Sequence, residues 1–125
     1  MAALQVGEIT RYLVPRGFTL AVTLEIADAT LGGLAFGVGM TTYSHKVGLQ
    51  CGPQAWTRIS LPQVGLYQEA VEAWEVVLGD GSVVTATREE HTDIFHCLPW
   101  SHGSLAFLVG LKLRIIPVKP YIHMR

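Results

Sequence analysis

Hydrophobic residues near the start of the chain recur at the spacing of one helix face. Val6, Ile9 and Leu13 are separated by three and four residues, and Gly17 stands where such a helix would end. This pattern predicts a short helix over Gly7–Val14. The proline that follows should tighten or fray its last turn, because proline removes a backbone donor.

The pattern then changes from helical to extended. Phe18–Ile26 is rich in β-forming side chains, which predicts an extended segment. This segment leads through Asp28 into a glycine-rich stretch at Thr30–Thr42. We therefore expect the glycine-rich stretch to follow an extended run.

The clearest local signal is a β-hairpin in the second half of the chain. Trp74–Leu78 and Val83–Thr87 are both strand-like and flank Asp80-Gly81. An Asp-Gly pair between two such runs is typical of a tight hairpin turn, because both residues tolerate positive φ. We expect the two runs to pair as antiparallel strands.

Two further elements are predicted after the hairpin. Arg88–Phe95 suits a helical turn, with Thr87 as its N-cap and Glu90 three residues further on. Leu105–Ile116 alternates apolar and charged residues towards its end, which predicts a half-buried strand ended by Pro117. We expect this strand to join the same sheet as the hairpin.

Gln50–Leu66 interrupts this regular pattern. Glycine and proline breakers surround a short polar run, so a surface loop is expected. The tripeptide Val47-Gly48-Leu49 reappears as Val64-Gly65-Leu66, as it would if a segment had been inserted between two copies of a junction. We interpret residues 50–66 as an insertion without catalytic meaning; a functional lid is the alternative.

The glycine-rich stretch carries the candidate chemistry. Four of the thirteen glycines lie between Gly32 and Gly39, where glycine can supply positive φ and allow close approach to a ligand. Backbone N–H groups, threonine hydroxyls and a nearby lysine could together bind a pyrophosphate. However, Thr42 stands where a dinucleotide fingerprint requires glycine, and no Gly-Lys-Ser/Thr follows. The alternative is a glycine-rich turn where two layers pack closely.

Composition excludes several classes of protein. The 125 residues are 50% hydrophobic and 15% charged, with a net charge of −1, so we expect one folded domain and no nucleic-acid partner. Glu25 and Asp28 interrupt the most apolar region, so no membrane span is expected, and the N-terminus lacks the pattern of a signal peptide. The five histidines fall at no metal-ligand spacing, and no metal site is expected.

Several motifs recur in a fixed order along the chain. They are Thr30-Leu31-Gly32-Gly33, Gly37-Val38-Gly39, Ser44-His45-Lys46-Val47-Gly48-Leu49, Glu75–Ser82, Asp93-Ile94-Phe95, Pro99-Trp100-Ser101 and Leu111–Pro117. In this order they resemble the second half of the FAD-binding domain of the vanillyl-alcohol-oxidase type (the PCMH fold), and more closely the Δ24-sterol reductases called seladin or diminuto. Outside residues 50–66 the resemblance covers nearly the whole chain.

The resemblance implies an α+β fold, with a mainly antiparallel sheet flanked by short helices and FAD bound between two subdomains. Residues 1–125 would form part of one such domain. The glycine backbone would face the FAD pyrophosphate, and Lys46 and Gly48 would extend that wall. The implied FAD-binding residues are Thr30, Leu31, Gly32, Gly33, Leu34, Ala35, Phe36, Gly37, Val38, Gly39, Met40, Thr41, Thr42, Lys46 and Gly48. No catalytic residue is assigned.

For a complete member of the family, the resemblance implies reduction of the side-chain double bond of a sterol, with NADPH as hydride donor and association with the endoplasmic reticulum membrane. This chain would be a soluble fragment that lacks the first FAD subdomain, the membrane anchor and the substrate domain. Ala106 departs from the family, which more often has glycine there, and residues 50–66 have no counterpart. Two function classes stay open: part of a flavin-dependent sterol reductase or of another flavin oxidase of this type, and a chain that does not catalyse.

Overall fold

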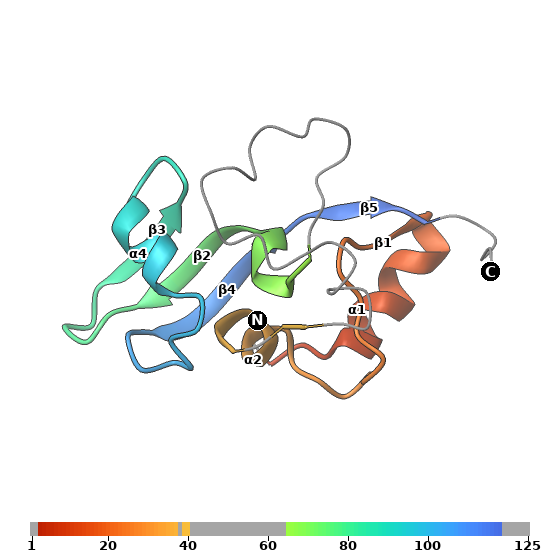
Figure 1. Ribbon diagram of the computed structural model, residues 1–125, viewed down its shortest axis with the longest axis horizontal. Coiled ribbons are helices and arrows are strands. Elements are labelled where there is room, and N and C mark those ends of the chain that lie inside the picture. The colour runs from red at the N-terminus through yellow and green to blue at the C-terminus, as the bar shows by residue number, and fades with distance from the viewer. Residues whose placement is uncertain (1–2, 38, 41–64, 119–125) are drawn as a thin grey trace.

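The computed structural model describes residues 3–37, 39–40 and 65–118. Figure 1 shows a three-stranded sheet with helix α4 at one end of the molecule, helix α2 beneath the sheet at the centre, and helix α1 with a two-stranded ribbon at the other end. The elements are α1 (Val6–Leu13), the 3-10 helix η1 (Val14–Arg16), β1 (Phe18–Leu20), α2 (Leu31–Phe36), the 3-10 helix η3 (Tyr67–Ala70), β2 (Val71–Val77), β3 (Val83–Thr87), α4 (Thr92–Cys97), β4 (Phe107–Leu113) and β5 (Ile115–Pro117).

The predicted hairpin is confirmed. Strands β2 and β3 pair antiparallel, with Val77 opposite Val83, and β4 pairs with the other edge of β2. Gly81 has a φ of +85° and donates its N–H to the Leu78 carbonyl at 3.0 Å. The Asp80 carboxylate accepts hydrogen bonds from the hydroxyl and the N–H of Ser82, and these bonds lower the pKa of Asp80. The turn chemistry thus sets the register of the hairpin.

The last predicted strand, Leu105–Ile116, is divided between two sheets. Strand β4 belongs to the three-stranded sheet, whereas β5 pairs antiparallel with β1. Arg114 lies between them: its N–H donates to the Ala70 carbonyl at 2.9 Å, and its carbonyl accepts from Ala21 at 3.4 Å. The expectation that this strand joins the sheet of the hairpin is confirmed for β4 and wrong for β5, because the backbone changes partners at Arg114.

Two local predictions need correction near the ends of strands. The extended segment expected over Phe18–Ile26 is a strand only at β1, because β5 offers just three residues to pair with. Thr87 does not cap a helix over residues 88–95. Its hydroxyl accepts from the N–H groups of Glu89 and Glu90 and closes a turn, and α4 begins later with His91 as its N-cap.

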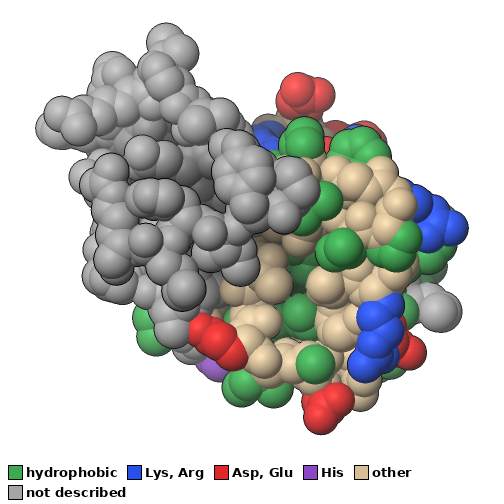
Figure 2. All heavy atoms as spheres, turned by 90° about the vertical axis from the view of Figure 1, so that its right-hand side faces the viewer, with side chains coloured by type: hydrophobic (Ala, Val, Ile, Leu, Met, Phe, Trp, Pro, Cys, Tyr) green, Lys and Arg blue, Asp and Glu red, His purple; other side chains and the backbone are tan. Residues whose placement is uncertain are grey.

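Helix α1 forms as its spacing predicted, although it begins one residue earlier. Val6 and Leu13 are buried, and a short 3-10 turn containing Pro15 follows before Gly17 ends the run with a φ of +83°. Figure 2 shows the side of the molecule that carries α1 and β5, where hydrophobic side chains are interspersed with charged ones. In the described part of the chain, no helix is long and apolar enough to cross a bilayer.

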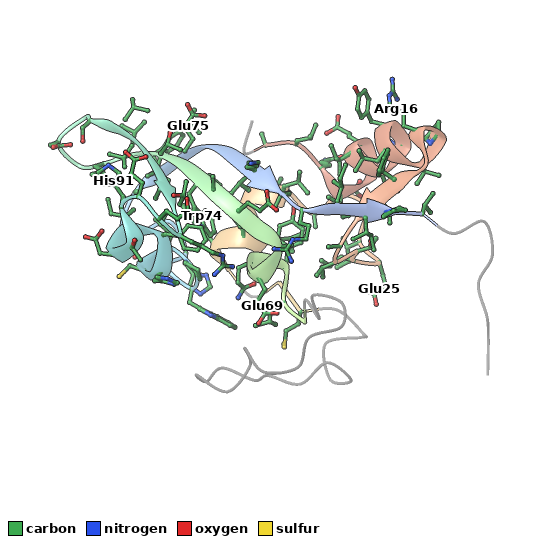
Figure 3. All side chains as sticks on the ribbon, turned by 90° about the horizontal axis from the view of Figure 1, so that it is seen from above. Arg16, Glu25, Glu69, Trp74, Glu75 and His91 are labelled. Carbon is green, nitrogen blue, oxygen red and sulfur yellow. The ribbon has the colours of Figure 1, made fainter. Side chains whose placement is uncertain are left out.

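The core lies between helix α2 and the inner face of the sheet. Trp74 and Val76 are fully buried, whereas Glu75 between them points to the opposite face, as Figure 3 shows for Trp74 and Glu75. This alternation follows from the two-residue period of a strand. Phe36 of α2 stacks on Trp74 with ring centroids 5.4 Å apart and thereby fixes the helix against the sheet.

Two valines in neighbouring strands test this division into inner and outer faces. Val76 is fully buried and Val83 is 66% exposed. Val76→Ala should lower the free energy of unfolding by about 2 kcal/mol, because it leaves a cavity in the core. Val83→Ala, the matched control, should change it by less than about 0.5 kcal/mol. Urea unfolding followed by tryptophan fluorescence measures both, and equal losses would contradict the assigned faces.

Candidate functional site

The glycine-rich stretch forms helix α2 rather than an open loop. Thr30 is its N-cap, and the Thr30 hydroxyl accepts a hydrogen bond from the Gly33 N–H at 3.3 Å. The described glycines with positive φ are Gly17, Gly81 and Gly103. The expectation that glycines 32–39 supply positive φ was therefore wrong, because burial of the apolar residues of α2 favours the helix over the intrinsic preference of glycine.

Two of these glycines are required by contacts within the protein itself. A Cβ added at Gly39 would collide with the Cβ of Tyr67, and one added at Gly37 would lie 2.8 Å from the Gly33 carbonyl oxygen. The Tyr67 N–H also donates to the Gly39 carbonyl at 2.8 Å. Close packing of two segments, the alternative considered above, accounts for Gly39, whereas Gly37 is confined by a carbonyl of its own helix.

Gly33 is in a different environment. It is exposed at the first turn of α2, and the Thr30 hydroxyl oxygen, at 2.9 Å, is the one atom found within 4 Å of an added Cβ. A Cβ at Gly33 would thus press on the Thr30 side chain rather than on backbone. Gly33 also helps to line a groove.

This groove has a volume of about 550 Å³ and lies between α2 and the start of β4. That volume is in the range of a pocket for a cofactor or another small molecule. One wall comes from residues 30–37 of the glycine-rich stretch, and the other from the residues that precede and begin β4. Its lining residues are Ala3, Thr30, Gly32, Gly33, Phe36, Gly37, His102, Gly103, Ala106, Phe107 and Leu108.

The structure brings together only some of the predicted FAD-binding residues. Thr30, Gly32, Gly33, Phe36 and Gly37 line the groove. The others lie elsewhere or are not described. Leu31 and Ala35 are buried in the core, and Leu34 is half-buried. Gly39 packs on Tyr67, and Met40 pairs with Leu66. The predicted residues that lie outside the described part of the chain are Val38, Thr41, Thr42, Lys46 and Gly48.

The second wall of the groove was not predicted as part of the site. The His102 N–H donates to the Phe36 carbonyl at 3.0 Å and ties this loop to the end of α2. Trp100, His102 and Gly103 have φ values of 68°, 51° and 77°, which is rare outside glycine and marks a tightly constrained loop. Ala106, noted above as a departure from the family, also lines this wall. The Pro99-Trp100-Ser101 motif was the available signal for this loop.

The groove has a mostly apolar lining with two polar side chains. Ala106, Phe107 and Leu108 supply apolar surface, whereas the Thr30 hydroxyl and the His102 imidazole are its polar side chains. No cluster of three potential metal ligands occurs among the residues that the structure describes. The arrangement can bind and orient a ligand, but it presents no nucleophile paired with a base.

Comparison with known proteins agrees with this fold. The structure of 6-hydroxy-D-nicotine oxidase from Arthrobacter nicotinovorans superimposes with a TM-score of 0.71 at 15% identity, over 93% of this chain and 22% of that one. The chain therefore shares with this oxidase an α+β fold of antiparallel sheets and short helices. No family model matches the sequence.

The sequence is related more specifically to sterol reductases. The Delta(24)-sterol reductase of Homo sapiens is 40% identical over 119 residues, which cover 95% of this chain and 20% of that protein. A FAD-dependent monooxygenase of Aspergillus calidoustus is 29% identical over 74% of the chain and 14% of its own length. The chain is thus a relative of the Delta(24)-sterol reductases and spans about a fifth of their length.

The contact between Gly39 and Tyr67 predicts a structural role for this glycine. Gly39→Ala should lower the free energy of unfolding by about 1–3 kcal/mol, because the added methyl group has no space. Gly79→Ala is the matched control, since nothing lies within 4 Å of an added Cβ there, and its stability should be unchanged or slightly higher. Thermal unfolding without added ligand measures both. An unaffected Gly39→Ala variant would show that the two segments are not in contact.

The buried hydroxyl of Tyr67 gives a second stability prediction. It has no hydrogen-bond partner among the described residues, and burial raises the pKa of the phenol above its ordinary value. Tyr67→Phe should therefore raise the free energy of unfolding by about 1 kcal/mol, because it removes an unsatisfied polar group. Tyr12→Phe, at a ring that is 56% exposed, is the matched control.

The same substitution should alter the alkaline limit of stability. A raised pKa in the folded state means that folding favours the neutral phenol. The part of the free energy of unfolding that comes from this preference is fully present below the unfolded pKa of about 10 and is lost as pH rises above that value. Tyr67→Phe should lose less stability than the unsubstituted protein between about pH 9 and 11. Identical pH profiles from urea unfolding would contradict the burial of this hydroxyl.

Proposed function

We propose that this chain forms one wall of an FAD site in a protein of the Δ24-sterol reductase type. The observation that carries the proposal is the groove lined by Thr30, Gly32 and Gly33, where the two glycines have no side chain. Relationship to the Delta(24)-sterol reductases supports it, as does the FAD dependence stated in the name of the Aspergillus relative.

The residues of the groove fit a flavin dinucleotide. Backbone at Gly32 and Gly33 would approach the diphosphate closely, since neither residue has a side chain to hold it away. The Thr30 hydroxyl, which already accepts one hydrogen bond from Gly33, would retain its own proton to donate to a phosphate oxygen. Phe107 is 74% exposed and offers apolar surface to a flat ring system. FAD, when bound, supplies hydride-transfer chemistry.

The residues of this chain would bind and orient the cofactor rather than react with the substrate. In a complete reductase the substrate would be a sterol with a side-chain double bond, and NADPH would be the hydride donor. The place of action would be the endoplasmic reticulum membrane. Because the groove is open on one side, we expect this chain by itself to bind FAD weakly and not to catalyse.

Titration of the chain with FAD tests this proposal. Flavin fluorescence should show binding weaker than about 10 μM, since half of the cofactor would stay in water. Gly33→Val should abolish binding, because its side chain would displace the Thr30 hydroxyl and add bulk at the lining of the groove. Lys46 lies outside the described residues. Lys46→Ala removes its single charge and should weaken FAD binding by only about threefold.

Two controls separate this role from a loss of folding. Gly79→Val alters a glycine with free space around it and should bind FAD like the unsubstituted chain. Circular dichroism of every variant checks that the fold is retained. Tight, stoichiometric FAD on the isolated chain would contradict the one-wall site, and unchanged binding in Gly33→Val would exclude this groove as the FAD site.

A further inference from the structure

His102 is held in the wall of the groove by its own backbone. Its φ of 51° places it in the left-handed region, and its N–H donates to the Phe36 carbonyl at 3.0 Å. The Nδ1 and Cε1 atoms of its ring lie 3.7 Å from the position that a Cβ at Gly37 would occupy. The imidazole therefore lies against the end of α2, on the surface that faces the groove.

His102 is also the one ionisable side chain among the groove-lining residues that the structure describes. Helix α2 has no charged residue, and the loop of residues 98–106 has no other ionisable one. On neighbouring elements, Asp28 before α2 and Asp93 and His96 of α4 are exposed outside the lining, and Lys112 lies at the far end of β4 near Glu72. Among the described residues that line the groove, no other side chain could supply a positive charge.

We infer that His102 contacts the diphosphate of the dinucleotide and makes its affinity depend on pH. An anion bound against a largely apolar wall needs a compensating donor or charge. Histidine changes its charge between about pH 5 and 8, whereas the FAD diphosphate stays ionised across that range. Binding is therefore tighter when the imidazole is protonated. This inference rests on the proposed FAD site and adds a specific residue to it.

FAD titrations of the 125-residue chain at pH 6 and pH 8, together with riboflavin, test the inference. The unsubstituted chain should bind FAD about threefold more tightly at pH 6, a modest effect because the imidazole is partly in solvent. Riboflavin has no phosphate, so its binding should be the same at both pH values. His102→Asn should bind FAD equally at both pH values, with the weaker affinity of the pH 8 protein.

Two further variants make the result specific. His91→Asn is a matched control, because His91 is also exposed, has a φ of 52° and lies outside the groove. It should keep the pH dependence, and asparagine tolerates this backbone conformation at both positions. His102→Arg carries a permanent charge and should bind FAD tightly at both pH values.

The outcomes distinguish this inference from the proposed site. A pH dependence that persists in His102→Asn, or that appears equally with riboflavin, would overturn the role of His102. If Gly33→Val still abolished binding in the same experiment, the FAD site itself would stand. No FAD binding by the unsubstituted chain at concentrations up to about 1 mM would overturn both.

Discussion

The stacking of Phe36 on Trp74 is the contact on which the groove depends. A helix of six residues is not stable in isolation, so α2 exists because its apolar side is buried against the sheet. The same helix presents Thr30 and Gly33 to the groove at its first turn. At its other end, the Phe36 carbonyl holds the backbone of His102. One aromatic pair thus positions both walls.

The sequence predicted those elements of the fold that depend on neighbouring residues. The hairpin at Asp80-Gly81 and helix α1 are local, and both form as expected. The division of the last strand could not be read from its alternating pattern, because alternation gives the buried face of a strand but not its partner. Arg114 makes one backbone bond to Ala70, just before β2, and one to Ala21, just after β1, and those partners lie far away in the chain. Such pairing is decided only when the sheets assemble.

The candidate site was predicted in part, for a similar reason. The glycines of residues 32–39 marked the right segment, but residue type alone does not distinguish a glycine that admits a ligand from one that admits a neighbour. Gly33 lines the groove, whereas Gly39 packs against Tyr67. The wall containing His102 and Phe107 comes from a distant part of the chain, so no local pattern connects it with α2.

The pairing of Met40 with Leu66 has a further consequence for how this fold can vary. These two residues face each other in an antiparallel bridge, so the chain departs from and returns to the same spot on the domain. The entropy cost of closing a loop grows only with the logarithm of its length, by about 0.6 kcal/mol for each doubling. The bridge therefore marks a position where additional residues can be inserted at a small cost in loop-closure entropy. A second domain whose own termini lie close together could be inserted at the same position.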